Sequence, residues 1–445
     1  MLGRGTGAAK GVGGNQHGSI GDNLMPVSRT KVESLPHAVF LQRVSSHPSP
    51  TSLEARLGQG AFLALRLVDL LAPGRGEVTA DAFHYQWVAT DRFCRELRGT
   101  SAEGAHVQGI TTSAADAYRL GDMRLLAPAL FAYAHFLEDE LRLEEALDVL
   151  ATLLDVGGTR VAAADSVATR LRVARVNRKL NRFDDAEAAY AEAGVLAAAN
   201  GDRHAELLSR IGHAECVRGR GNLPEAERSL LGILADARAA RDRDAEARAE
   251  HHVGTVLFSR GQPDVAVPHC WRAYELYEDE DSRLRALADV GVMLLTVGDA
   301  VAAEHALLEV TRRGTTQDGV SNAAIELMHC ASYRRDRLGF ARWRERCEAR
   351  LADMPPNIRA DFYLKQGIGQ ARFGQYRRAV GLLDQALAVA GAAGLHEFEF
   401  RIERIKNGLG DCEQALQMEP AASAEPVFDT EELREVSASL AQLVG

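Results

Sequence analysis

One alanine recurs along the chain at intervals of 37 to 40 residues, and this period constrains the fold more than any other feature of the sequence. In most copies a turn-forming residue stands five positions before the alanine, as Asn181, Gly221 and Gly261 do. Larger and smaller apolar side chains follow it by four and seven positions, which places all three on one face of a helix. The aligned alanines are Ala146, Ala186, Ala226, Ala266, Ala303, Ala341 and Ala379.

A second pattern precedes the alanine. A pair of residues stands 13 and 12 positions upstream, and its second member is often small, as in Val173-Ala174, Val253-Gly254 and Val290-Gly291. Each unit is therefore predicted to be a helix, a short turn and a second helix, with a small residue on each helix where the two cross. Such a unit cannot bury its apolar face alone, so the units must stack on one another. The sequence predicts an all-α array.

At these positions the chain resembles the tetratricopeptide repeat family. The resemblance covers roughly residues 121–394, or about seven repeats. It departs from the family in its long period, the loss of the tryptophan of the first helix and the absence of the closing proline. It implies a right-handed superhelical solenoid with a concave groove lined by first helices, like the long repeats of bacterial regulators that sense peptides or small inducers and of scaffold proteins. The clearest matches are Val253-Gly254 with Gly261 and Ala266, Val290-Gly291 with Gly298, Ala303 and Leu307, and Val173-Ala174 with Asn181, Ala186, Tyr190 and Ala193.

The flanking segments differ in composition from the array. Eight of the first 21 residues are glycine, so residues 1–50 are predicted to form a disordered arm; the alternative is that translation starts at Met25. Helical patterns indicate degenerate repeats or a cap over residues 51–120 and a capping helix over residues 395–418. Residues 419–445 hold six acidic side chains against one arginine and end in a short amphipathic helix.

The overall composition excludes several classes of protein. The 62 acidic side chains outnumber the 52 basic ones, which disfavours nucleic-acid binding, and no apolar run reaches the roughly 18 residues that a membrane span requires. The six cysteines are scattered without a CxxC pair, which favours a reducing, cytoplasmic location.

The spacing of histidine, cysteine and acidic residues in the sequence does not indicate a catalytic or metal site. Pairs such as His251-His252 and His269-Cys270 are sequence neighbours, and neighbours on a helix point too far apart to chelate one ion. No nucleophile with a matched base stands out, and the carboxylate clusters fall at helix ends. We expect no enzyme, no cofactor and no metal.

Basic residues on the outward faces of the first helices are the candidate binding residues. Arginine offers a fork of donors that matches a carboxylate, so such a stripe suits an acidic peptide or protein segment. The plain alternative is that these side chains form an ordinary solvated helix surface. The residues are Arg172, Arg175, Lys179, Arg248, His252, Thr255, Arg285, Tyr333, Arg334, Lys365 and Arg372.

The sequence thus predicts a scaffold or adaptor that binds a protein or peptide in the concave groove. The alternative is a regulatory sensor whose groove binds a peptide or small-molecule signal, and an enzyme on this scaffold is a third, unsupported class. The acidic tail, residues 419–445, is a second candidate ligand of the groove, either within one chain or in a partner molecule.

Overall fold

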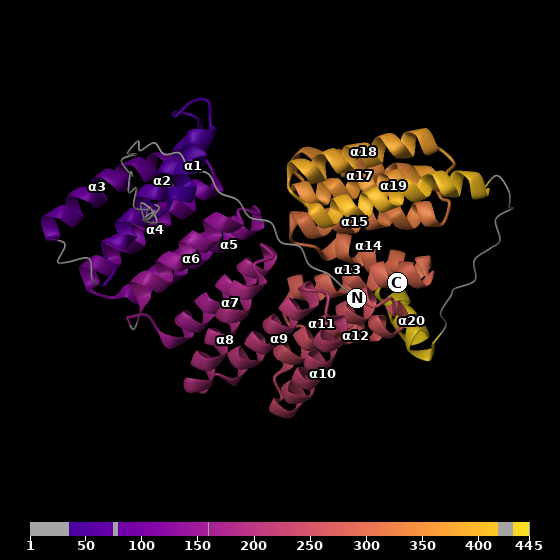
Figure 1. Ribbon diagram of the computed structural model, residues 1–445, viewed down its shortest axis with the longest axis horizontal. Coiled ribbons are helices and arrows are strands. Elements are labelled where there is room, and N and C mark those ends of the chain that lie inside the picture. Colours follow the sequence, from indigo (N-terminus) through magenta and orange to yellow (C-terminus); the bar gives the residue numbers. More distant parts are fainter. Residues whose placement is uncertain (1–34, 74–78, 159, 417–429, 445) are drawn as a thin grey trace, which may run out of the picture.

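The computed structural model describes residues 35–73, 79–158, 160–416 and 430–444, and within these ranges every regular element is helical (Figure 1). The N-terminal helices are α1 (Ala38–Ser46), α2 (Leu53–Asp69), α3 (Ala80–Leu97) and α4 (Ala102–Leu120), followed by the short 3-10 helix η1 (Met123–Leu126). The array comprises α5 (Ala127–Asp139), α6 (Leu143–Gly157), α7 (Ala163–Lys179), α8 (Phe183–Ala199), α9 (Arg203–Gly219), α10 (Leu223–Ala240), α11 (Arg243–Ser259), α12 (Pro263–Leu276), α13 (Glu280–Val297), α14 (Ala300–Arg313), α15 (Gln317–Tyr333), α16 (Arg337–Glu348), η2 (Leu351–Asp353), α17 (Pro356–Arg372) and α18 (Tyr376–Ala392). The chain ends with α19 (His396–Leu416) and α20 (Glu431–Val444).

From α5 to α18 the helices form consecutive antiparallel pairs, as the repeat predicts. Each aligned alanine lies on the second helix of its pair, and all are fully buried except Ala341 on α16, which is half-buried. The all-α prediction is confirmed for the residues that the structure describes. The first helices are α5, α7, α9, α11, α13, α15 and α17, and the second helices are the even-numbered ones from α6 to α18.

The turn inside each pair adopts the left-handed backbone that the sequence indicates. Gly221, Gly261 and Gly298 have φ angles of 84°, 78° and 99°, and Asn181 has 58°. In the first and sixth pairs Leu141 and Arg335 adopt the same conformation, at 58° and 59°, although neither is a residue type that favours it. The tertiary packing of the two helices therefore imposes the turn even where the local sequence opposes it.

Replacing Gly261 with alanine is expected to destabilise the fold by about 1 kcal/mol, because an L-residue pays to adopt a positive φ. An added Cβ would meet no atom within 4 Å, so the cost is conformational and not steric. Gly381 in α18 is the matched control, since its Cβ position is also open but its backbone is helical. Gly381→Ala should stabilise the fold by roughly 0.5 to 1 kcal/mol. Urea unfolding of both variants measures the difference, and equal effects would refute the backbone argument.

Close helix crossings depend on the small residues of the first helices. A Cβ added at Gly254 would lie 2.5 Å from Sγ of Cys270 and 3.1 Å from the carbonyl oxygen of Ala266. At Gly291 it would lie 2.8 Å from Cγ of Leu307. The second helix of each of these pairs thus packs directly on the backbone of the first.

Helix α1 corrects the predicted boundary of the disordered arm. Residues 38–46 are helical and Phe40 is fully buried, so the expectation of disorder through residue 50 is wrong for this helix. The rest of the predicted arm, residues 1–34, lies outside the described residues. His37, at the start of α1, ion-pairs with Asp69 of α2 (3.2 Å) and Asp148 of α6 (2.5 Å). Burial opposes its protonation, but the two carboxylates outweigh it and raise the pKa of His37 to about 9.

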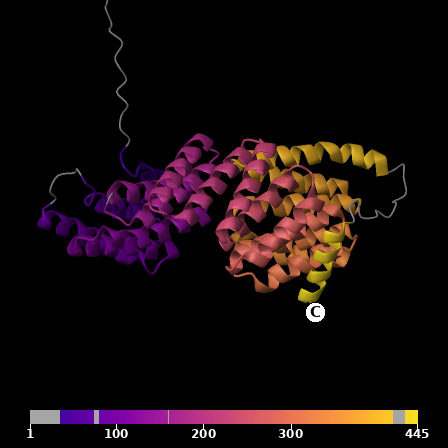
Figure 2. The same cartoon turned by 90° about the horizontal axis from the view of Figure 1, so that it is seen from below.

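The array is bent along its length. Helices α1–α6 lie at one end of the long axis, α15–α19 lie at the other, and α7–α11 join them along one edge (Figure 1). Helix α19 packs on α18 and α17 and covers the end of the stack, within the segment expected to cap it. Figure 2 shows α19 and α20 on different sides of the C-terminal block.

Candidate functional site

The first helices carry nearly all of the predicted binding residues. Helix α7 holds Arg172, Arg175 and Lys179, and α11 holds Arg248, His252 and Thr255. Arg285 is on α13, Tyr333 ends α15 with Arg334 directly after it, and Lys365 and Arg372 are on α17. Their location on one set of helices agrees with the prediction, while their contact with a ligand stays a prediction.

Most of these cations already have a carboxylate partner on a neighbouring helix. Glu138 of α5 is buried and accepts hydrogen bonds from Arg175 (2.8 Å) and Lys179 (3.0 Å) of α7. Burial raises the pKa of the Glu138 carboxyl, but the two cations outweigh it and hold the pKa below its ordinary value. Glu138 is therefore ionised, and it ties the first repeat to the second.

Glu215 of α9 has the same role in the next repeats. This buried carboxylate lies 3.1 Å from His252 of α11, 2.9 Å from Arg218 on its own helix and 3.6 Å from Arg178 of α7. Burial disfavours its charge, yet the surrounding cations hold the pKa of Glu215 well below the ordinary range. One glutamate thus joins three successive first helices.

Lys365 of α17 is buried, and it pairs with Asp361 at 2.6 Å and with Glu326 of α15. Burial lowers the pKa of Lys365, but the two carboxylates outweigh burial and raise the pKa above its ordinary value. The ammonium group therefore remains charged. Arg248 pairs with Asp244 (2.7 Å) in its own helix, and Arg334 pairs with Glu304.

The predicted basic stripe is thus partly neutralised, whereas Arg372 donates to Ser332 at 2.9 Å and lies over the Tyr333 ring without a carboxylate partner among the described residues. Neighbouring first helices pack closely, so a cation on one comes within reach of a carboxylate on the next, and a buried charge is stable only when it is paired. The sequence did not show the pairs with Glu138, Glu215 and Glu326 because these partners lie about a whole repeat away in the chain.

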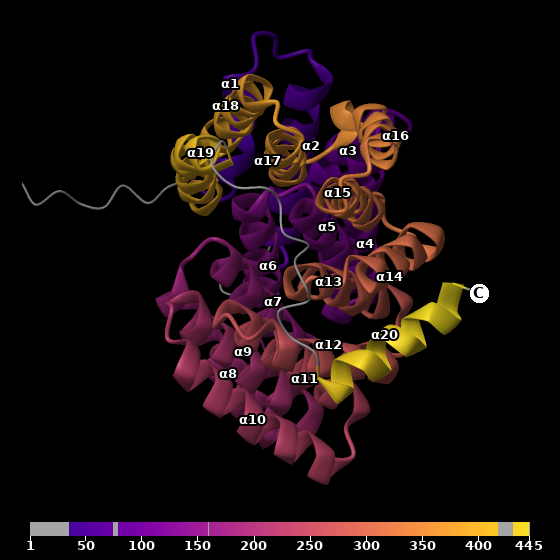
Figure 3. The same ribbon diagram turned by 90° about the vertical axis from the view of Figure 1, so that its right-hand side faces the viewer.

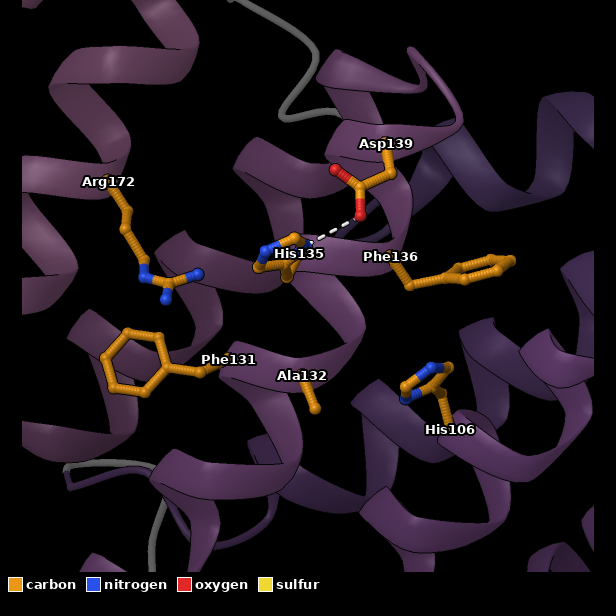
Figure 4. Close-up of a pocket in the computed structure, with 7 residues that line it drawn as sticks. All are labelled: His106, Phe131, Ala132, His135, Phe136, Asp139 and Arg172. Atoms are coloured by element: carbon orange, nitrogen blue, oxygen red, sulfur yellow. Dashed lines mark ion pairs between the residues drawn. The ribbon is translucent and has the colours of Figure 1, made fainter. Parts of the chain in front are cut away.

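Arg172 is the predicted residue that lines a cavity. The cavity is a shallow, open depression of about 370 Å³ between α4, α5 and α7 (Figure 4). The guanidinium lies over the Phe131 ring, 5.0 Å from its centre, and no carboxylate of the described residues lies within ion-pairing distance. Its Nη1 atom is buried without a hydrogen-bond partner among those same residues. The lining residues are His106, Phe131, Ala132, His135, Phe136, Asp139 and Arg172.

The electrostatics of this pocket favour an anionic group near Arg172. Burial, and then repulsion from Arg175, lower the pKa of the guanidinium more than the negative charge of Glu138 raises it, so an added negative charge would relieve an unfavourable environment. Burial also lowers the pKa of His106, which leaves its ring neutral at pH 7. The ring is tilted by 36° against that of Phe136, with 5.2 Å between their centres. His135 pairs with Asp139 at 2.8 Å on the rim.

Sequence reasoning missed the aromatic residues of this pocket. Phe131 and Phe136 lie in the first repeat pair, where they look like ordinary core residues, and His106 belongs to α4, before the array begins. Their convergence depends on how α4 packs against α5. The one sequence feature that could have indicated this convergence is the number of aromatic residues close to Tyr133.

The charge of Asp139 on the rim also acts on a distant repeat. Asp318, at the start of α15, has a raised pKa because of burial first and the negative charge of Asp139, which ends α5, second.

A second cavity, of about 670 Å³, opens between the second helices α8 and α10, with α9 lining it as well. Small residues such as Gly194 and Gly232 line it together with Arg210, His213 and Arg228. Arg210 and Arg228 are paired with Asp236 and Glu225. This cavity therefore lacks an unpaired guanidinium of the kind that Arg172 provides.

Within the described ranges no three His, Cys, Asp or Glu side chains are arranged to hold a metal ion. The five cysteines that the structure describes are buried and unpaired. No helix among the described residues combines the length and the apolar character needed to cross a bilayer.

Comparisons with known proteins give distant structural similarity only. No protein-family model matches the chain, and no curated protein matches it. The apo form of the quorum sensor NprR from B. thuringiensis is 13% identical, covers 86% of this chain and 98% of its own, and has a TM-score of 0.48. A Rap protein complexed with competence and sporulation factor is 12% identical, covers 82% and 98%, and has a TM-score of 0.40. The Rap conjugation gene regulator of the plasmid pLS20, in complex with the Phr* peptide, is 11% identical, covers 75% and 97%, and has a TM-score of 0.45.

Because these identities and TM-scores are low, the fold is established from the helix pairs of the chain itself. Over the residues that the structure describes, the chain is an all-α solenoid of tetratricopeptide-like helix pairs. Its repeat period, its left-handed turns and its close glycine crossings are all observed directly.

Proposed function

We propose that the concave side of this solenoid binds a peptide or protein segment and that the Arg172 pocket anchors a carboxylate of that ligand. The observation that carries the proposal is a half-buried guanidinium that lacks a carboxylate partner among the described residues while it lines a cavity with two phenylalanines. The neighbouring cations Arg175 and Lys179 both pair with Glu138.

The pocket has the chemistry of a peptide anchor. Phe131 and Phe136 offer apolar surface to a side chain, and Arg172 offers a planar fork of donors to a carboxylate. Stacking on Phe131 orients the guanidinium before the ligand arrives, which lowers the entropy lost on binding. The volume of about 370 Å³ suits a side chain and a terminal carboxylate better than a whole folded domain.

A sensor function is the second candidate, and the effect of the Asp139 charge on the pKa of Asp318 favours it, because it couples the rim of the pocket to α15. In a sensor, a ligand held on α5 and α7 would change the distance between the two ends of the array. Small-angle scattering with and without ligand distinguishes the two: a scaffold keeps its radius of gyration, whereas a sensor changes it.

Replacing Arg172 with glutamine is the direct test. Peptides selected from a random display library against the full-length protein are measured by isothermal titration with the wild type and with Arg172→Gln. A hydrogen bond to a charged group contributes about 1.5 to 3 kcal/mol, so we expect affinity to fall by about 10- to 100-fold.

Arg228→Gln is the matched control, because Arg228 lines the cavity between α8 and α10. It should leave affinity unchanged. If Arg228→Gln lowers affinity and Arg172→Gln does not, the binding site is on the side of the second helices and the proposal fails. A library that yields no binder to the wild type also counts against it.

A further inference from the structure

The C-terminal helix α20 lies away from the concave side. It packs on α14 and α12, two successive second helices, and Figure 3 shows it crossing both. The prediction that the acidic tail docks in the groove is therefore not what the structure shows for residues 430–444. Residues 419–429 lie outside the described residues.

Helix α20 is held by one apolar face. Leu433, Val436 and Leu440 are at most 5% exposed and join the apolar cluster of the central repeats, with Leu443 packed against it. Their spacing of three, four and three residues gives a single stripe along the helix. Ser437 donates a hydrogen bond to Asp299, the residue that caps α14, at 2.8 Å.

The opposite face of α20 is polar and open. Glu431, Glu432 and Glu435 are exposed, as are Ala438 and Gln442. Thr430 accepts a hydrogen bond from the backbone amide of Leu433 and caps the helix. The helix is thus amphipathic and needs no further neighbour on its outer side.

The array does not need α20 to complete a repeat. Helix α19 already covers the last pair, since it packs on α18 and α17. At 14 residues, α20 is also near the length below which an isolated helix is marginal in water, so its helical state depends on docking. It is joined to the rest of the protein through residues 417–429, which makes it a tethered ligand of the surface beneath it.

We propose that the surface formed by α12 and α14 is a binding site for an amphipathic helix of a partner protein, and that α20 occupies this site as a displaceable internal ligand. The chemistry of the partner follows from α20 itself: apolar residues at positions i, i+3, i+7 and i+10 and carboxylates in the first turn. This is the helix-in-groove mode of recognition, in which a few apolar anchors provide specificity. The site is independent of the concave pocket proposed above.

The test uses the full-length protein and a fluorescein-labelled synthetic peptide of residues 429–445 as the probe of the site. In the wild type the peptide must compete with tethered α20, whose effective concentration is of order millimolar. Leu440→Asp places a charge in the buried stripe and should undock α20, so peptide affinity measured by anisotropy should rise by about 10- to 100-fold. Ala438→Asp adds the same charge to the exposed face and should bind the peptide as weakly as the wild type.

A disulfide supplies a second, independent measurement. Asp299→Cys with Ser437→Cys should lock α20 in place under oxidising conditions, because the two native side chains are in contact. The locked protein should lose peptide binding and recover it on reduction.

The proposal is overturned if Leu440→Asp remains folded by circular dichroism and gains no affinity. It is also overturned if the oxidised cysteine pair binds the peptide as well as the reduced pair. Peptide binding that Arg172→Gln abolishes would move the site to the concave side and likewise overturn it. Failure of the concave-pocket proposal leaves these expectations unchanged.

Discussion

Replacing Glu103 with glutamine should lower the free energy of unfolding by about 3 kcal/mol, the lower end of the cost of breaking a buried ion pair, because Arg43 and Arg142 keep Glu54 and Glu145 as their remaining partners. Glu103 of α4 is 4% exposed and lies 2.8 Å from Arg43 of α1 and 2.9 Å from Arg142, directly before α6. The Tyr133 hydroxyl donates a further hydrogen bond to it at 2.9 Å. Burial disfavours the charge of Glu103, but both arginines outweigh this and hold its pKa below the ordinary value.

The measurement is urea unfolding followed by circular dichroism. Glu96→Gln is the control, since Glu96 pairs with Arg56 at 2.7 Å on the surface, with its side chain 59% exposed. An exposed pair contributes about 0 to 1 kcal/mol, so this variant should unfold close to the wild type. Equal losses in the two variants would show that Glu103 does not hold α1 and α4 against the array.

Introducing valine at Gly254 should destabilise the protein by about 3 kcal/mol, the upper end of the usual range for overpacking a core. The first added atom would lie 2.5 Å from Sγ of Cys270 and 3.1 Å from the backbone oxygen of Ala266. The side chain can turn away, but the backbone oxygen cannot, so α11 and α12 must separate. Thermal unfolding monitored by circular dichroism gives the size of the loss.

Gly381→Val is the control, because its Cβ position in α18 meets no atom within 4 Å. We expect it to change stability by no more than about 0.5 kcal/mol. A double-mutant cycle with Cys270→Ala adds a second test: removing the sulfur should recover some of the loss, so the two changes should not be additive. Strict additivity would contradict the proposed crossing contact.

The helix pairs were predictable because their signals are local. The spacing of Ala266, Cys270 and Ala273 defines one helical face, and a glycine such as Gly261 permits the left-handed turn that ends the preceding helix. These features depend on a few consecutive residues and on the geometry of one helix. The same reasoning failed for α1, where the contacts of His37 with Asp69 and Asp148 stabilise a helix in a segment with little periodic pattern.

The candidate site was only partly predictable. The sequence placed Arg172, Arg175 and Lys179 on one helix face. It did not show that Arg175 and Lys179 have a carboxylate partner while Arg172 has none among the described residues. Arg175 and Lys179 are 37 and 41 residues from Glu138, and only the stacking of α7 on α5 brings them together. The aromatic lining of the pocket likewise needs α4, which belongs to no recognisable repeat.

The sequence by itself determined that this chain is a stack of helix pairs, with its period, its turns and its buried alanines, because these follow from helical geometry over short distances. Only the tertiary structure decided which cations are neutralised, where a cavity opens and which surface α20 covers. Ser437 meets Asp299 across 138 residues of sequence, and no local pattern encodes such a distance. Pairing of buried charges and docking of apolar faces depend on which helices become neighbours, which is a property of the whole stack.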